Sequence, residues 1–140
     1  MKISTRARYG TKALLELALH ENGELVPLKE ISQRQEIPLP YLEHLIGPLV
    51  QAGIVRSTRG IGGGVSLLKP PRQVVLSEVI ELFEGPIFLV DCVNNPESCS
   101  HSGYCVTRGL WQDIREAMSG VLESLTLQDL VERQRRETKP

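Results

Sequence analysis

A run of glycines near the middle of the chain restricts the fold more than any other feature of the sequence. Residues 59–64 read RGIGGG and lie between two short strand-like stretches, residues 54–58 and 65–69. Glycine has no Cβ, so a chain rich in it turns tightly and its backbone approaches other groups closely. The segment predicts a hairpin with a glycine-rich tip. A nucleotide-binding loop is excluded, because no Gly-Lys-Ser/Thr is present and a strand-like segment, not a helix, follows.

Three segments with helical periodicity precede the hairpin. The first runs from Ser4, a good N-cap residue, to about His20, the second covers residues 28–35, and the third starts near Pro40. Three helices with a short link between the last two, followed by a hairpin, predict a winged helix-turn-helix domain over residues 1–72. The predicted fold is therefore mainly α, with a small β-wing.

Pro48 is an irregularity inside the third helical segment. A proline lacks the N–H that a helix needs, and its ring clashes with the carbonyl group four residues earlier. We therefore expect a kink or an early helix end near Gly47-Pro48.

The net charge of the whole chain, −1, conceals an asymmetry between its two parts. Residues 1–72 carry ten basic and six acidic side chains, a net charge of +4, whereas residues 73–140 carry six basic and eleven acidic ones, a net charge of −5. This split fits chance variation of a surface as well as it fits a basic part that meets a polyanion. A neutral sum does not exclude nucleic acid as a partner.

The start of the third helix carries the side chains that we expect to contact double-stranded DNA. Recognition helices read base edges in the major groove through polar side chains near their N-terminus. Pro40, Tyr41, Glu43 and His44 occupy that stretch. A glutamate accepts a hydrogen bond from cytosine N4, and a histidine or tyrosine reaches a base edge or a phosphate. For Tyr41 we expect packing within the domain or a phosphate contact.

The glycine-rich tip is the second candidate DNA contact. As a wing it places Arg59 where the guanidinium can enter the minor groove or bind a phosphate, and Gly60 lets the backbone come close. Arg56 lies on the same predicted strand. The alternative is an arginine that is only exposed on a hairpin, and we favour the wing.

The second half of the chain has a different character. Residues 73–105 predict a connecting helix over 76–83 and then a loop rich in Asn, Pro, Ser and Gly. Residues 106–131 contain a predicted long helix, to about residue 125, with apolar residues at helical spacing. A wing domain alone cannot cover that apolar surface, so we expect this helix to form a homodimer. The charged tail, residues 132–140, is expected to be flexible and frayed.

The three cysteines of the chain all lie in the predicted loop, at Cys92, Cys99 and Cys105. Three thiolates in one loop can hold a metal or an iron–sulfur cluster. Zinc usually takes four ligands that include a closely spaced Cys pair, which the C-x6-C-x5-C spacing lacks. Free thiols, or a disulfide switch that uses two of the three, remain alternatives.

The compartment follows from what the sequence lacks. No run of eighteen apolar residues is present, and the N-terminal segment MKISTRARYG has no apolar core of a signal peptide. We expect a cytoplasmic protein without membrane contact, where thiols stay reduced. No Cys-x-x-Cys and no base–nucleophile arrangement is visible, so we do not expect an enzyme.

Several motifs in matching order and spacing carry a family resemblance over roughly residues 1–131. They are ARYGTKALLELAL, PLKEISQRQEIPLPYLEHL, RGIGGGVSL, EVIELFEG, the three-cysteine loop, CVTRGLW and TLQDLV. On these residues the chain resembles the Rrf2-type transcriptional regulators, and most closely their IscR-like branch of iron–sulfur cluster regulators. The resemblance implies a homodimeric winged-helix repressor or activator. It also implies a [2Fe-2S] cluster, held by the three cysteines and one non-cysteine ligand, whose occupancy tunes which promoters are bound.

The sequence departs from that pattern in two places. Arg108 stands where the IscR-like branch has its histidine, and a guanidinium has no lone pair to offer iron. The candidate fourth ligand is then His101, with Asp91 and Glu97 as oxygen alternatives, although His101 is equally well explained as a solvated loop residue. Six residues rather than five separate the first two cysteines, so a [4Fe-4S] nitric-oxide sensor of the same family is the alternative. A cluster-free thiol switch and a wing domain used only for protein contacts are the competing hypotheses.

Overall fold

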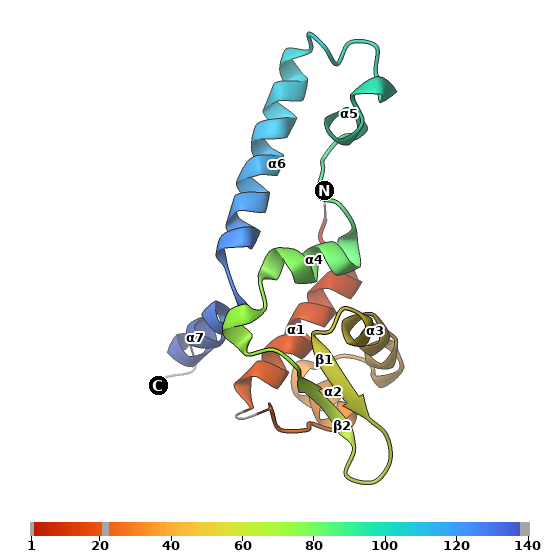
Figure 1. Ribbon diagram of the computed structural model, residues 1–140, viewed down its shortest axis with the longest axis vertical. Coiled ribbons are helices and arrows are strands. Elements are labelled where there is room, and N and C mark those ends of the chain that lie inside the picture. Colours follow the sequence, from red (N-terminus) through yellow and green to blue (C-terminus); the bar gives the residue numbers. More distant parts are fainter. Residues whose placement is uncertain (1, 21–22, 138–140) are drawn as a thin grey trace.

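The structure, a computed structural model, describes residues 2–20 and 23–137. A body of packed helices with a hairpin lies at one end, and a long helix and a loop project from it (Figure 1). The helices and strands are, in chain order, α1 (Thr5–Leu19), α2 (Leu28–Gln35), α3 (Leu39–Gln51), β1 (Val55–Thr58), β2 (Gly64–Leu67), the 3-10 turn Pro71–Gln73, α4 (Leu76–Glu84), α5 (Asp91–Asn94), the 3-10 turn Pro96–Ser98, α6 (Val106–Ser124) and α7 (Leu127–Glu137). We call α1 to α4, the hairpin and α7 the head, and residues 85–124 the arm.

Helix α1 is the centre of the head. The Ser4 side chain caps it by accepting a hydrogen bond from the Ala7 backbone N–H at 3.1 Å. Its apolar stripe, which includes Ala13, Leu14 and Leu17, is buried against the neighbouring helices. Gly10 faces the Phe83 ring of α4 so closely that a Cβ would collide with it. The predicted first helix is confirmed, and it forms the surface on which the other helices of the head pack.

Helices α2 and α3 form the helix-turn-helix. The turn between them places Glu36 at a positive φ of 54°, and the Ser32 hydroxyl donates to the Ile37 carbonyl at 2.6 Å. The expected early end of α3 at Pro48 does not occur, because the helix continues to Gln51. Residues on both sides of Pro48, at positions 45, 46 and 49, are buried in the core and hold the helix in place despite the missing hydrogen bond.

The hairpin is the predicted two-stranded wing. Strands β1 and β2 pair antiparallel, with Val55 opposite Leu67 and Thr58 opposite Gly64. A bridge joins Val65 to Val26, with N···O distances of 2.8 and 2.9 Å, and anchors the hairpin to the segment that enters α2. The buried valines fix one face of the hairpin on the core, and its tip projects away from the helices of the head (Figure 1).

The arm consists of a segment that leads away from α4, the short helix α5, a loop and the long helix α6, which returns toward the head beside that segment (Figure 1). Two arginines of α6 tie the two together. Arg115 Nε donates to the Ile87 carbonyl and Arg108 Nε donates to the Cys92 carbonyl, each at 2.9 Å. The predicted long helix is confirmed, whereas the short helix α5 was not predicted.

The tail is ordered where we expected fraying. Helix α7 extends through the charged residues to Glu137, and the expectation of a frayed tail from residue 132 is wrong over that range. Leu127 and Val131 are buried against α1, which explains why a helix rich in charge holds its position. Residues 138–140 lie outside the described residues. Among the described helices, none is long and apolar enough to cross a membrane.

Candidate functional site

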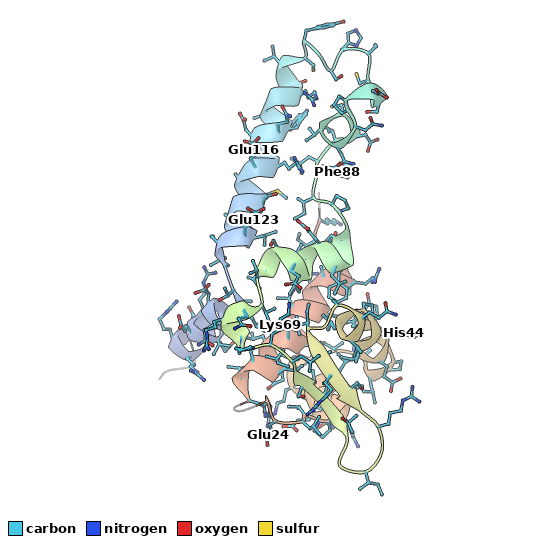
Figure 2. All side chains as sticks on the ribbon, in the orientation of Figure 1. Glu24, His44, Lys69, Phe88, Glu116 and Glu123 are labelled. Carbon is cyan, nitrogen blue, oxygen red and sulfur yellow. The ribbon has the colours of Figure 1, made fainter. Side chains whose placement is uncertain are left out.

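The start of α3 presents three of the four predicted side chains to solvent. Glu43 and His44 are exposed, and His44 points outward from α3 in Figure 2. Pro40 is exposed within the first turn, where a missing N–H removes no helical hydrogen bond. Tyr41 is half-buried and meets the Tyr9 ring edge to face, with centroids 5.4 Å apart. Tyr41 therefore packs within the head, which is one of the two roles expected for it, the other being a phosphate contact.

A groove separates α3 from the wing and brings Glu43, Arg59 and Gly60 together. Pro40, Tyr41 and His44 do not line it. Its other walls come from the middle and end of α3, from the hairpin and from the start of α2, with lining residues Pro27, Leu28, Ile46, Gly47, Val50, Gln51, Ser57, Thr58, Gly63 and Gly64. Sequence reasoning identified the glycine-rich tip, which includes Gly63 and Gly64, but missed the other positions, although the α3 members repeat at the helical spacing of Glu43 and identify one face.

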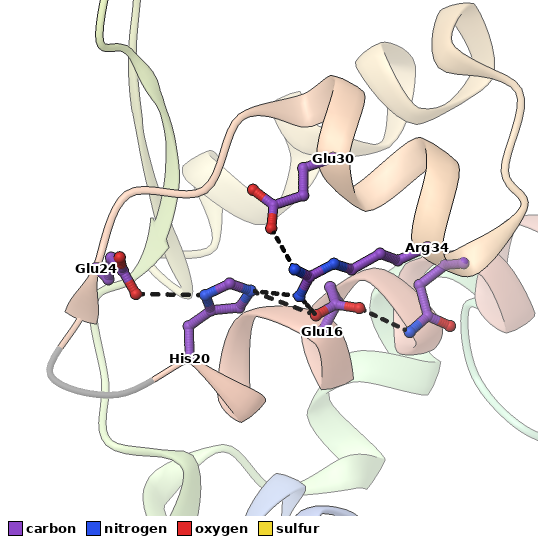
Figure 3. Close-up of polar contacts among 6 residues, drawn as sticks. Glu16, His20, Glu24, Glu30 and Arg34 are labelled. Carbon is purple, nitrogen blue, oxygen red and sulfur yellow. Dashed lines mark hydrogen bonds and ion pairs between the residues drawn. The ribbon is translucent and has the colours of Figure 1, made fainter.

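A buried carboxylate fixes the position of α2 on α1. The Glu16 side chain, only 6% exposed, lies 3.4 Å from Arg34 Nη1 and accepts a hydrogen bond from Gln35 Nε2 at 3.3 Å. Arg34 also pairs with Glu30 at 2.8 Å, and His20 bridges Glu16 and Arg34 with its Nε2, 3.4 Å from each (Figure 3). A buried charge is tolerated only with partners of this kind. These residues, Glu16, His20, Glu30, Arg34 and Gln35, form the Glu16 network, which positions the helix-turn-helix. In the sequence, Glu16 shows only as a polar residue on an apolar stripe.

The three cysteines of the arm differ in their solvent exposure. Cys92 on α5 and Cys105 before α6 are half-buried, Cys99 is exposed, and all three are free thiols. Turns shape the loop between them: Ser102 N–H donates to the Cys99 carbonyl at 3.2 Å, and Tyr104 N–H to the His101 carbonyl at 3.1 Å. His101 is exposed and stacks edge to face on Tyr104, 5.6 Å away.

The donor set fits an iron–sulfur cluster in its chemistry, because three thiols and a nearby imidazole are groups that ligate such clusters. Within residues 2–20 and 23–137, no three His, Cys, Asp or Glu side chains are gathered closely enough to hold a metal ion. Binding therefore requires a rearrangement of the cysteine loop. The exposed Cys99 lies on the part of the loop between the two half-buried cysteines, where such a change costs little packing.

Arg108 and Thr107 surround Cys105 at the start of α6. The Thr107 hydroxyl, 3.1 Å from the sulfur, is the main cause that lowers the pKa of the Cys105 thiol below its usual value. The Arg108 backbone N–H and guanidinium act in the same direction. Because the Arg108 Nε is hydrogen-bonded to the Cys92 carbonyl, the side chain joins the segments of the first and third cysteines. At the position where the resemblance implies a ligand, Arg108 makes a hydrogen bond to the protein backbone.

Helix α6 contains no buried residue in the single chain. Val106 is 89% exposed, Leu110 50% and Val121 56%, so a row of large apolar side chains faces solvent. Toward the C-terminal end of α6, the helix and the N-terminal segment form an apolar groove lined by Lys2, Ile3, Ala117, Met118, Val121 and Leu122. Exposed apolar surface of this extent on a regular helix indicates an interface.

Known proteins share both the sequence and the fold. The Rrf2 profile, described as an iron-dependent transcriptional regulator, matches residues 3–133. The HTH-type transcriptional regulator IscR of Photorhabdus laumondii is 38% identical over 134 residues, 96% of this chain and 81% of that protein. The solved structure of T. potens IscR has a TM-score of 0.81 at 32% identity and covers 100% of this chain and 93% of its own. CymR, the global cysteine regulator of B. subtilis, has a TM-score of 0.79 at 38% identity over 95% and 98%.

These relatives are regulators of transcription, which confirms the expected non-enzymatic role and the expected winged-helix fold. The match covers the head and the arm together, so the likeness is not confined to the helix-turn-helix. The chain belongs to the Rrf2 family of transcriptional regulators.

Proposed function

We propose that this protein is a homodimeric, cytoplasmic transcriptional regulator that binds promoter DNA, and that an iron–sulfur cluster in the cysteine loop tunes this binding. The observation that carries the proposal is the combination of two features in one chain. A groove between α3 and the wing holds Glu43 and Arg59, and a loop with three free thiols connects α4 to α6.

The DNA contacts are assigned to α3 and the wing. Glu43 and His44 at the start of α3 meet base edges or phosphates, and Arg59 and Gly60 approach the minor groove beside them. Pro40 and Tyr41 shape the start of α3, with Tyr41 held by its ring contact to Tyr9. The exposure of Glu43, His44 and Arg59 supports this assignment.

The cluster ligands are assigned to Cys92, Cys99 and Cys105, with His101 as the candidate fourth ligand. A bound cluster supplies a redox-active, oxygen- and nitric-oxide-sensitive group to the loop. A [2Fe-2S] cluster is the first choice and a [4Fe-4S] cluster the alternative. Arg108 is not a ligand; its bond to the Cys92 carbonyl keeps the first and third cysteines on one structural unit.

The loop is connected to the DNA-binding surface through α4. The segment that carries Cys92 continues directly from α4, and α4 packs against α1 through Phe83 and Gly10. The Glu84 carboxylate accepts a hydrogen bond from the Ser4 N–H at 2.7 Å, at the start of α1. Gathering the cysteines would reshape the arm at its junction with α4, and α1 carries α2 and α3, so cluster occupancy biases their position.

Anaerobic spectroscopy with iron and sulfide analysis tests the cluster. We expect visible charge-transfer absorption and equal amounts of iron and sulfide. Cys99→Ser abolishes this signal, whereas the neighbouring Ser100→Ala retains it. Arg108→Gln keeps the iron content, and His101→Ala lowers it. Full cluster content in the Cys99→Ser protein contradicts the ligand assignment.

A gel shift with duplex DNA selected from a random pool tests the regulator function. We expect binding that falls steeply with salt, because phosphate contacts release counterions. Cluster-loaded and cluster-free protein should select different sequences or bind one sequence with different affinity. A protein that binds no duplex even at low salt is not a DNA-binding regulator.

A thiol switch without a cluster is the second candidate, favoured by one observation. Cys105 is half-buried with a lowered thiol pKa, and Cys99, six residues earlier in the loop, is exposed and free. Reversible oxidation of two cysteines to a disulfide would then change DNA binding. Mass spectrometry of an oxygen-treated, iron-free sample separates the two, since a disulfide that alters DNA affinity in the absence of iron supports the switch.

A further inference from the structure

Ile61 is the most exposed of the large apolar side chains that the structure describes, with an exposed fraction of 109%. It lies at the tip of the hairpin, between the two strands, and none of the side chains that the structure describes covers it. A single exposed isoleucine on a surface needs no explanation. Ile61 differs from such a residue because it lies in a hydrogen-bonded turn whose backbone conformation favours the glycines around it.

Those glycines build a defined turn. The Gly63 N–H donates to the Gly60 carbonyl at 3.0 Å, which closes a four-residue turn with Ile61 in its second position. Gly60 has a φ of 95° and Gly62 a φ of 78°, values that side-chain-bearing residues rarely adopt. A Cβ at Gly63 would collide with the Thr58 carbonyl oxygen. The turn is therefore available only to glycine at these positions, and it directs Ile61 outward from the end of the wing.

The surroundings of Ile61 belong to the candidate DNA surface. Arg59 and Gly60 precede it and line the groove shared with α3, and Arg56 is exposed on the same hairpin. Cations of this kind bind the phosphates on either side of a minor groove. Ile61, which follows them at the tip, makes no ionic contact, but it has the shape and polarity of the side chains that minor-groove proteins insert between base steps.

We propose that Ile61 is an apolar wedge that enters the minor groove next to the α3 contact and partly unstacks one base step. This inference rests on the proposed DNA binding and goes beyond it, because it assigns a specificity determinant that makes no hydrogen bond. Pyrimidine–purine steps such as TA unstack most easily. The wedge therefore makes binding prefer a flexible step at the place that the wing contacts, and it bends the duplex there.

The test compares variants of the full-length protein on a duplex that the wild type selects from a random pool. Footprinting locates the wing contact, and 2-aminopurine placed there reports unstacking by its fluorescence. We expect Ile61→Ala to bind roughly tenfold more weakly, because most of the buried apolar side chain is lost. It should also lose the fluorescence increase and the bend, while its salt dependence stays that of the wild type.

Three further variants separate the wedge from other causes. Ile61→Leu restores binding and unstacking, since a side chain of similar volume is kept. Leu68→Ala, which removes another exposed apolar side chain of the wing region, 54% exposed, changes neither. Arg59→Ala lowers the slope of affinity against salt by about one phosphate contact.

The outcomes are distinguishable. Wild-type affinity and unstacking in Ile61→Ala, on a duplex that the wild-type protein binds, overturn the wedge and leave the regulator function intact. Equal affinity of the wild type for duplexes with a TA or a GC step under the wing also overturns it. A wild-type protein that binds no duplex overturns the proposed DNA binding and the wedge with it.

Discussion

The head and the arm of this molecule solve the problem of apolar surface in different ways. The head buries its apolar side chains in one core that joins α1, α2, α3, the hairpin, α4 and α7. The arm has almost no core: among the residues of α5 and α6, only Val93 is buried, while Val106, Leu110 and Val121 remain open to solvent. The head buries its apolar surface within one chain, whereas the arm leaves the apolar side chains of α6 uncovered.

This difference places the cysteine loop on the less stable part of the chain. Segments with few buried contacts open at low free-energy cost, and ligand-responsive elements are drawn from such segments. The loop is held by backbone turns and by the guanidinium of Arg108, not by a core. A ligand or a partner chain can therefore reshape the arm without unfolding the head.

Truncation of a core leucine tests the stability of the head and has the largest expected effect. Leu14→Ala should lower the free energy of unfolding by about 3 kcal/mol, because Leu14 is 1% exposed and leaves a cavity in α1's packed face. Denaturant unfolding measures this loss, which should not depend on protein concentration. Leu110→Ala is the matched change in the arm, and its effect should grow with protein concentration. Equal, concentration-independent losses would erase the distinction between head and arm.

A charge on α6 tests the covering of the arm by a second chain. Val121→Asp places a carboxylate beside the apolar groove formed with Ile3 and Met118. If α6 is a homodimer interface, the dissociation constant should rise about a hundredfold, because a buried, unpaired charge opposes association. Analytical ultracentrifugation measures this shift, and circular dichroism checks that the helices persist. Glu123→Gln, which changes the charge at another exposed position of α6, serves as the control. An unchanged dissociation constant for Val121→Asp would remove this surface from the interface.

The Glu16 network tests whether the head also depends on polar contacts. Glu16→Ala should lower the free energy of unfolding by about 2 kcal/mol, because Arg34, Gln35 and His20 lose a buried acceptor. Glu24 contacts the other side of the His20 ring, and its side chain is 65% exposed. Glu24→Ala should therefore lower the free energy of unfolding by less than about 0.5 kcal/mol. Thermal unfolding of the two variants at one pH gives the comparison. Equal losses would mean that burial of Glu16 contributes nothing.

The sequence predicts the N-terminal part of the head, α1 to α4 with the hairpin, better than the later parts of the chain, for physical reasons. Local signals mark the head: Ser4 caps α1, periodic apolar residues define α1 to α3, and the glycine run marks the wing. These signals depend on neighbours in the chain. The returns of the chain onto the head, such as α7 on α1, depend on contacts between distant residues, which single-sequence patterns do not carry.

In the candidate site, too, some features follow from local signals in the sequence and others from contacts between distant residues. Residue types and spacing identify Glu43, Arg59 and the cysteines as candidates without structural information. The groove between α3 and the wing, the hydrogen bond from Arg108 to Cys92, and the burial of Glu16 are tertiary facts. No periodicity shows that a carboxylate on an apolar stripe has partners on the next helix, so only the structure identifies it as a positioning residue.

The start of α7, where the chain returns from the arm to the head, provides the prediction with the smallest effect. Asp129 Oδ2 accepts hydrogen bonds from the Thr126 backbone N–H at 2.8 Å and from its hydroxyl at 3.1 Å, and the Asp129 N–H donates to the same hydroxyl at 3.3 Å. This reciprocal arrangement is a capping box. The backbone bond first, and the hydroxyl bond second, lower the pKa of the Asp129 carboxyl below its usual value.

The sign of the pH effect follows from that direction. Because the pKa is lower in the folded state, the stabilisation is complete above the unfolded-state value of about 3.9 and is lost as the pH falls through the folded-state value. Thr126→Val removes the hydroxyl and should raise the pKa of Asp129 part of the way back, since the backbone bond remains. It should lower the free energy of unfolding at neutral pH by about 1 kcal/mol. NMR titration of the Asp129 carboxyl measures the shift, and Ser124→Ala, whose hydroxyl donates to the Val121 carbonyl, is the control. An unchanged Asp129 titration in Thr126→Val would show that the cap does not form in solution and that α7 is held on the head by its other contacts, such as the burial of Leu127 and Val131.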